Sequence, residues 1–283
     1  MRGEFVDLGG TRLYYYAAGT RGGGDPVVLL HGFPGSSHSW RELAPLMPEG
    51  RRLVVVDLMG CGRSDGPPVA GRTGARAGSP AASIAAHVAL IRALMDDLAI
   101  TRAALVGHGI GGAIAQAVAL GHPDRVSALL LISSIAFDAW PRRLARLARL
   151  TSPAATLIGA PMLASFVHGS AIRGYTDREA GRRALDHSLR AYPAHLGCDA
   201  LVAHLFAPAD PAIAAYGARL GEIGVPTAVV WGEDDPFLSL TVGERLRSAI
   251  RGATLEVVPE ARHFVHEEAP EVCARVAAEL FER

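Results

Sequence analysis

Charge imbalance is absent from this sequence of 283 residues: Lys and Arg together count 28, Asp and Glu also count 28, and the formal net charge is zero. Long-range attraction to nucleic acid or to an anionic membrane surface needs an excess of positive charge. The balance therefore argues against both as partners. It suits a small, mostly apolar ligand.

Cysteines and long apolar runs are also scarce. The three cysteines, Cys61, Cys198 and Cys273, are odd in number, far apart and without metal-ligand spacing. We therefore expect a reduced compartment and neither a metal nor another cofactor. No apolar stretch approaches the ~20 residues that a membrane helix needs, and the N-terminus lacks the apolar run and small-residue cleavage site of a signal peptide. These absences predict a soluble, cytoplasmic protein.

The chain length fits one large α/β domain with an insertion better than two domains of similar size. Short apolar runs, typical of strands buried on both faces, alternate with segments that have the three- and four-residue apolar spacing of helices. Two predicted strands lie within residues 4–17, and six more are Pro26–Leu30, Leu53–Leu58, Ala103–Val106, Ala128–Ile132, Thr227–Trp231 and Thr254–Val258. The predicted helices are Ile84–Leu98, Ile110–Leu120, Val242–Ile250 and Glu271–Phe281. This alternation predicts a doubly wound, mostly parallel sheet.

Two stretches interrupt the alternation. Residues 66–82 are rich in Gly, Pro and small side chains, which predicts a loop. Residues 134–220 contain no strand-like run but several helical patterns, including Arg142–Leu150 and Arg182–Ala191. We expect an inserted helical cap there, over the carboxyl ends of the strands, where ligands bind in open α/β sheets. The α/β core would then comprise residues 1–133 and 221–283.

Three motifs follow successive predicted strands. They are HGFPG at His31–Gly35, DLMGCGRSD at Asp57–Asp65 and GHGIGG at Gly107–Gly112. In this order they resemble the α/β-hydrolase superfamily, and within it the branch of epoxide hydrolases, haloalkane dehalogenases and related C–C hydrolases. The resemblance spans nearly the whole chain outside the cap. It implies the α/β-hydrolase fold and a small-molecule substrate.

The resemblance also assigns catalytic roles. In the family, the acid follows the next-to-last strand and a histidine follows the last one. Asp235, with Asp234 as the fallback, and His263 match these positions. The carboxylate would fix the tautomer of the imidazole and stabilise its protonated form. The family's oxyanion hole corresponds to the backbone amides of Phe33 and Ile110.

Glycine occupies the position of the attacking side chain. Gly109 lies at the centre of GHGIGG, where the family places Ser, Asp or Cys. Glycine adopts the strained dihedrals of this turn without a Cβ clash, but it supplies no attacking atom. We therefore expect His263 to remove a proton from water or from the substrate, with the oxyanion held by backbone amides. Hydrolysis, lyase chemistry and cyclisation without a covalent intermediate all fit these residues.

Five further side chains are candidates for substrate contact: His31, Trp40, His108, Tyr175 and Tyr192. The two histidines fit a structural role as well, with backbone hydrogen bonds. The two tyrosines lie in the expected cap, where epoxide hydrolases use tyrosines to donate to the epoxide oxygen and where packing tyrosines are also common. Phe33 replaces the asparagine with which haloalkane dehalogenases commonly hold the halide, and this disfavours dehalogenation.

Two other functions stay open. One substitution at Gly109 would restore the GHDxGG pattern of epoxide hydrolases, so the chain could be an inactivated Asp- or Ser-nucleophile hydrolase. A non-catalytic small-molecule receptor is the second, although it would not need the His263–Asp235 pair. Arg262 replaces the glycine that usually precedes the family histidine, which predicts a positive charge near the site.

Overall fold

The structure, a computed structural model, describes residues 3–20, 22–66, 83–139, 160–190, 200–201 and 211–283. Its strands are β1 (Glu4–Asp7), β2 (Arg12–Ala18), β3 (Val27–Leu30), β4 (Leu53–Val56), β5 (Ala103–His108), β6 (Val126–Ile132), β7 (Thr227–Gly232) and β8 (Thr254–Val258). They form one eight-stranded sheet in the order β1-β2-β4-β3-β5-β6-β7-β8. The six strands from β3 to β8 are parallel, and β1 and β2 are antiparallel to their neighbours. The predicted sheet is confirmed.

Side chains that alternate along the central strands pack into two separate apolar cores, one on each face of the sheet. In β3 every residue is buried; Val28 and Leu30 join one apolar cluster, while Val27 and Leu29 join the other. Successive residues of a strand point to opposite faces, so an uninterrupted apolar run fits a sheet covered on both sides. This is why the short runs in the sequence identify these strands.

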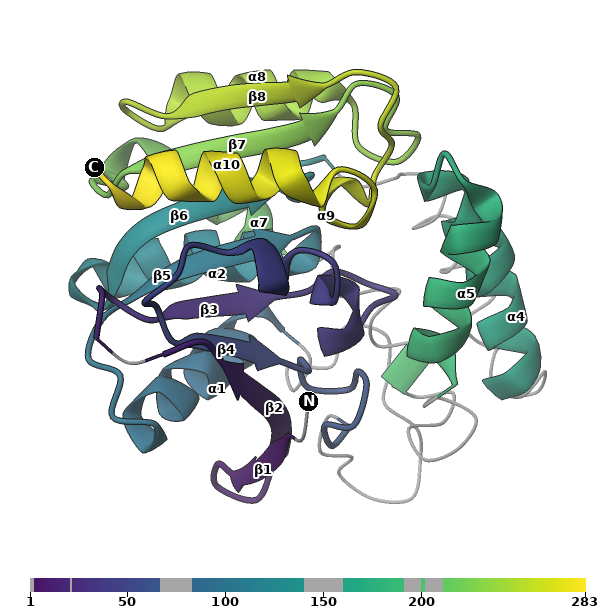
Figure 1. The fold of residues 1–283 in the computed structure, drawn as a ribbon, viewed down its shortest axis with the longest axis horizontal. Coiled ribbons are helices and arrows are strands. Elements are labelled where there is room, and N and C mark those ends of the chain that lie inside the picture. Colours follow the sequence, from purple (N-terminus) through teal and green to yellow (C-terminus); the bar gives the residue numbers. More distant parts are fainter. Residues whose placement is uncertain (1–2, 21, 67–82, 140–159, 191–199, 202–210) are drawn as a thin grey trace.

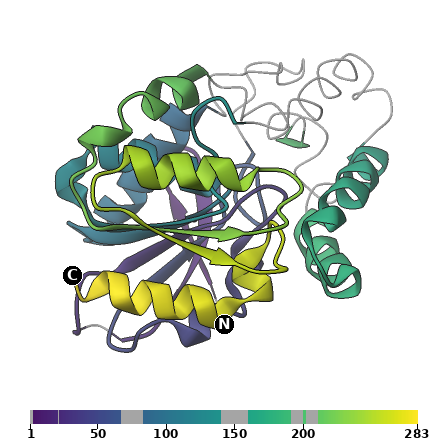
Figure 2. The same ribbon diagram turned by 90° about the horizontal axis from the view of Figure 1, so that it is seen from above.

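Helices cover both faces of the sheet (Figures 1 and 2). On one face lie α1 (Ile84–Asp97), α2 (Ile110–Gly121), α7 (Pro211–Gly217) and α8 (Leu240–Ala249), and on the other lies α10 (Pro270–Phe281). Within the described ranges, no helix is both long and apolar enough to cross a lipid bilayer.

Two helices of the expected cap, α4 (Ala160–Ala171) and α5 (Arg178–Leu189), stand beyond the carboxyl ends of the strands (Figure 1). Their apolar side chains form a small cluster with Tyr175 and with Phe264 of the loop after β8, and this cluster includes Leu163 and Leu185. The helix predicted at Arg182–Ala191 overlaps α5. The helix predicted at Arg142–Leu150 lies outside the described residues, as does nearly all of the predicted loop.

The far end of the expected cap packs differently. Ile213 of α7 lies in the main core, against the helices of the sheet, rather than with α4 and α5. A helical pattern in the sequence shows that one face is buried but does not show against what. The boundaries of the cap at residues 134 and 220 stay a prediction.

Candidate active site

A sharp turn joins β5 to α2 at Gly109. Its dihedrals are φ 54° and ψ −118°, outside the regions that side chains favour. A Cβ added at Gly109 would lie 3.4 Å from Cα of Gly32 and 3.9 Å from Nε2 of His263. The position that the sequence predicted for the nucleophile therefore faces the imidazole of His263.

Asp235 and His263 form the predicted pair. Oδ2 of Asp235, whose side chain is fully buried, lies 2.7 Å from Nδ1 of His263. The other carboxylate oxygen accepts hydrogen bonds from the amides of Phe237 (2.8 Å) and Leu238 (3.0 Å). The fallback acid, Asp234, is exposed. The carboxylate of Asp235 accepts a hydrogen bond from the Nδ1–H of His263. Nε2 is then the nitrogen that faces Gly109 and can take up a proton.

The two predicted oxyanion donors lie beside this turn. Ile110 is the first residue of α2, where backbone N–H groups have no partner within the helix. Phe33 follows Gly32, whose Cα approaches Gly109, and the Phe33–Pro34 peptide bond is cis. The structure thus brings both residues of the expected oxyanion hole to the elbow.

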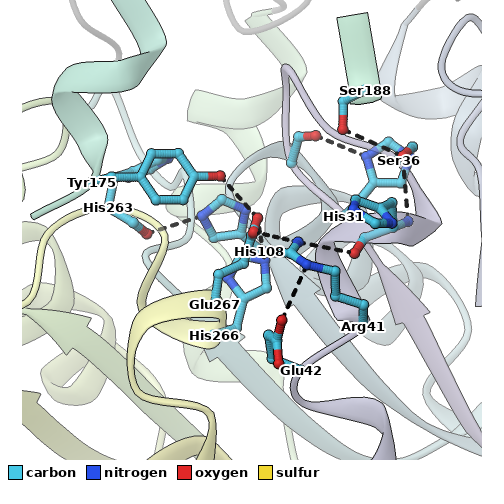
Figure 3. Close-up of polar contacts among 12 residues, drawn as sticks. His31, Ser36, Arg41, Glu42, His108, Tyr175, Ser188, His263, His266 and Glu267 are labelled. Carbon is cyan, nitrogen blue, oxygen red and sulfur yellow. Dashed lines mark hydrogen bonds and ion pairs between the residues drawn. The ribbon is translucent and has the colours of Figure 1, made fainter. Parts of the chain in front are cut away.

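Three candidates for substrate contact lie in the core instead. The ring of His31 is fully buried: Nδ1 is 2.8 Å from the Gly32 carbonyl and Nε2 accepts from the amide of Leu58 at 3.0 Å. His108 is held by the carbonyl of His263, 3.1 Å from its Nε2 (Figure 3). Trp40 is completely buried. Burial lowers the pKa of both histidines, which favours the structural role that the sequence also allows, and their contact with substrate stays a prediction.

Tyr175 also makes its contacts within the protein. Its side chain is buried, its ring stacks on Phe264 with centroids 4.2 Å apart, and its hydroxyl donates to Oε1 of Glu267 at 3.0 Å (Figure 3). This hydroxyl is thus bonded to a carboxylate, and its donation to a substrate oxygen stays a prediction. Tyr192 lies outside the described residues.

Two residues of this network were missed by sequence reasoning. Glu267 is buried, and its Oε2 accepts from the guanidinium of Arg41 at 2.7 Å. Burial raises the pKa of Glu267, while Arg41 and the hydroxyl of Tyr175 oppose that rise. Nothing in the sequence around Arg41 or Glu267 distinguishes them from surface charges, since each pairs with a residue far away along the chain.

Arg262 links its loop to the expected cap. Its guanidinium donates to the carbonyl of Arg173 at 3.0 Å, and an effect of its charge on the site stays a prediction. Where side chains are described, no cluster of three or more His, Cys, Asp or Glu residues could hold a metal ion.

A glycine elbow between strand and helix, faced by a buried Asp–His pair from the last two strand ends, defines an acid–base site of the α/β-hydrolase type. The chain belongs to this family, because the family model described as alpha/beta hydrolase fold matches residues 25–270. It is an enzyme of the α/β-hydrolase superfamily.

Relatives share this fold over most of their length. A 2-hydroxy-6-oxononadienedioate/2-hydroxy-6-oxononatrienedioate hydrolase of Paraburkholderia phymatum is 32% identical, over 90% of this chain and 86% of the relative. Epoxide hydrolase 3 of Xenopus tropicalis is 25% identical, over 93% and 72%. The crystal structure of an alpha/beta hydrolase fold protein from Burkholderia ambifaria matches with a TM-score of 0.76 and 26% identity, over 100% of both chains.

Proposed function

We propose that the protein is a hydrolase in which His263, oriented by Asp235, acts as a general base without a covalent nucleophile. Nε2 of His263 takes a proton from a water molecule as the water oxygen attacks the substrate carbonyl. The amides of Phe33 and Ile110 hold the oxyanion, and the imidazolium returns its proton to the leaving group. The observation that carries this proposal is the 3.9 Å approach of Nε2 to the Cβ position of Gly109, a residue without a side chain.

The backbone donors make such a reaction physically reasonable. They belong to the main chain and do not depend on the residue at position 109. Loss of one oxyanion donor costs roughly 10²- to 10³-fold in kcat in enzymes where it has been measured. A site that keeps its donors and its base therefore keeps a large part of its transition-state stabilisation.

The substrate class that fits best is a carbonyl compound. The relative from P. phymatum is named for an oxo acid, and oxyanion donors act on a carbonyl oxygen as it gains charge. Epoxide opening needs a group that protonates the ring oxygen. Tyr175, one of the two tyrosines that we expect to donate to an epoxide oxygen, already donates its hydroxyl to Glu267.

Substrate turnover in matched variants tests the proposal. The wild-type protein, His263→Ala, Gly109→Ser and Gly109→Asp are incubated with aryl and alkyl esters, epoxides and β-hydroxy ketones, and products are followed by mass spectrometry. His122→Ala, beyond the far end of α2, serves as a control histidine. Turnover by the wild type and the control, lost in His263→Ala, supports general-base catalysis.

A second function has its own observation in its favour. A Cβ at Gly109 would come no closer than 3.4 Å to a neighbouring atom, so a side chain there meets backbone strain but no steric clash at its first carbon. Turnover that occurs only in Gly109→Ser or Gly109→Asp would overturn the proposal and identify an inactivated covalent hydrolase. For Gly109→Asp, solvent ¹⁸O should then enter the carboxylate. Tight binding of a compound without turnover in any variant would instead indicate a receptor.

A further inference from the structure

The segment that joins α4 to α5 in the expected cap is bonded directly to the loop that carries His263. The backbone amides of His263 and Phe264 both donate to the carbonyl of Gly174, at 3.0 and 3.3 Å. Two residues further along the cap, the amide of Thr176 donates to Oε1 of Glu268 at 2.6 Å. The backbone amide of the proposed base, His263, is therefore hydrogen-bonded directly to the cap.

Tyr175 supplies the side-chain part of the same junction. Its ring lies parallel to that of Phe264, at 13°, and the ring of Phe264 meets the imidazole of His263 edge-on with centroids 5.2 Å apart. Stacked and edge-on aromatic contacts favour particular ring orientations. Tyr175, Phe264 and His263 thus form a continuous series of ring contacts from cap to base.

The hydroxyl of Tyr175 fixes the other end of this loop. It donates to Glu267, whose side chain is 3% exposed and whose second oxygen binds Arg41 (Figure 3). A buried carboxylate is costly unless its oxygens have donors, so these two donors hold Glu267 and the turn of α9 (Val265–Glu268) in place. The loop that carries His263 is thereby held by contacts before and after Phe264.

The polar end of Tyr175 is separate from the reacting groups. It borders a pocket of about 430 Å³ that is also lined by Arg41, Glu260, Glu267 and Glu268. His263, Asp235 and Gly109 are not among the residues that line it. An effect of Tyr175 on the reaction must therefore be transmitted through the loop.

We propose that Tyr175 is a positioning residue for His263, acting through Phe264 and Glu267, so that the base is oriented only while the α4–α5 connection of the cap is docked on its loop. The proposal rests on the general-base role of His263. It assigns the cap a part in assembling the site in addition to covering it. Both contacts of Tyr175 are needed. The hydrogen bond to Glu267 sets the position of α9, and the ring stack sets the plane of Phe264.

Proton NMR tests the orientation of His263 without any turnover. The Nδ1 proton shared with Asp235 gives a low-field resonance, assigned by its loss in His263→Ala. Tyr175→Phe keeps the ring stack and removes the bond to Glu267. Tyr15→Phe is the matched control, because the Tyr15 hydroxyl also donates to a glutamate, Glu4, at 2.9 Å, on strands at the edge of the sheet. We expect the resonance to shift or broaden in Tyr175→Phe and to stay unchanged in Tyr15→Phe.

Kinetics supply the second measurement. Tyr175→Phe and Glu267→Leu should each lower kcat by between roughly tenfold and a hundredfold, with little change in KM, because misplacing a catalytic group affects the transition state most. The double variant should be no worse than Glu267→Leu alone, since that change already removes the acceptor of the Tyr175 hydroxyl. Additive losses, or an unchanged resonance in folded Tyr175→Phe and Glu267→Leu, would overturn the proposal. If His263→Ala retained turnover, the general-base role would fail, while the resonance would still report on positioning.

Discussion

Gly109 and His263 face each other across the elbow, with Nε2 of the imidazole 3.9 Å from the position that a Cβ of residue 109 would take. The glycine comes from the β5–α2 turn and the histidine from the loop after β8. Their approach depends on the order of the parallel strands, which brings both carboxyl ends to the same edge of the sheet. The sheet thus fixes the separation of base and elbow before any side chain at position 109 is considered.

Gly109→Ala should destabilise the fold by about 1 to 3 kcal/mol, because a residue with a Cβ is strained at φ 54° and ψ −118°. Urea unfolding measures the change. Gly121→Ala, at the other end of α2, is the matched control: no atom lies within 4 Å of its added Cβ, so this variant should be as stable as the wild type or more so. Equal stability of Gly109→Ala and the wild type would contradict the strain argument.

Asp235→Asn should lower kcat by roughly 10³- to 10⁴-fold with the fold intact, because an amide no longer selects the Nδ1–H tautomer of His263. The remaining amide oxygen can still accept from the backbone amides of Phe237 and Leu238. Steady-state kinetics measure the loss. The same change at the exposed neighbour, Asp234→Asn, should leave kcat unaltered, and similar losses in both variants would remove the specific role of Asp235.

Acid should destabilise the protein through its buried histidines. Burial lowers the pKa of His31, His87, His108 and His266 below the ordinary value of 6.5. Below pH 6.5 the unfolded chain binds protons that the folded chain does not. The free energy of unfolding therefore falls as pH drops, by up to about 1.4 kcal/mol per pH unit for each such histidine.

His266→Leu isolates one of these contributions. Neither ring nitrogen of His266 has a hydrogen-bond partner among the described residues, and its Nε2 lies 3.9 Å from Glu267, too far for a hydrogen bond. The variant should lose less stability on acidification, by about 1.4 kcal/mol per pH unit below the ordinary histidine pKa. Urea unfolding between about pH 5 and pH 8 checks this. Parallel stability curves for variant and wild type would contradict it.

The sheet and the elbow were predictable because their signals are local. Val27–Leu30 is apolar at every position, as a strand covered on both faces must be, and Gly109 occupies a fixed place in its motif. Asp235 and His263 were predictable through the resemblance to α/β-hydrolases, which places the acid and the histidine after the last two strands. Strand order and motif spacing together therefore account for the pair that the structure brings to the elbow.

The cap junction was not predictable, because its partners come from separate segments. The sequence around Tyr175 does not show whether its hydroxyl contacts a ligand or Glu267. The packing of the expected cap against the core determines which of the two it contacts. The burial of His31 and His108 was not predictable either. It depends on neighbouring residues that lie outside the motifs in which the two histidines occur. Ile213 shows the limit of helix prediction. The helical spacing predicts that one face of its helix is buried, but not which element covers that face.

The backbone of the elbow also has an evolutionary consequence. The glycine codons GGU and GGC differ by a single base from codons of serine and of aspartate, and a Cβ at position 109 would meet no neighbouring atom closer than 3.4 Å. A lineage with this elbow can therefore gain or lose an attacking group in one mutational step, while sheet, cap and base are inherited unchanged. Position 109 is thus the place where the chemistry of this scaffold can diverge with the least change to its fold.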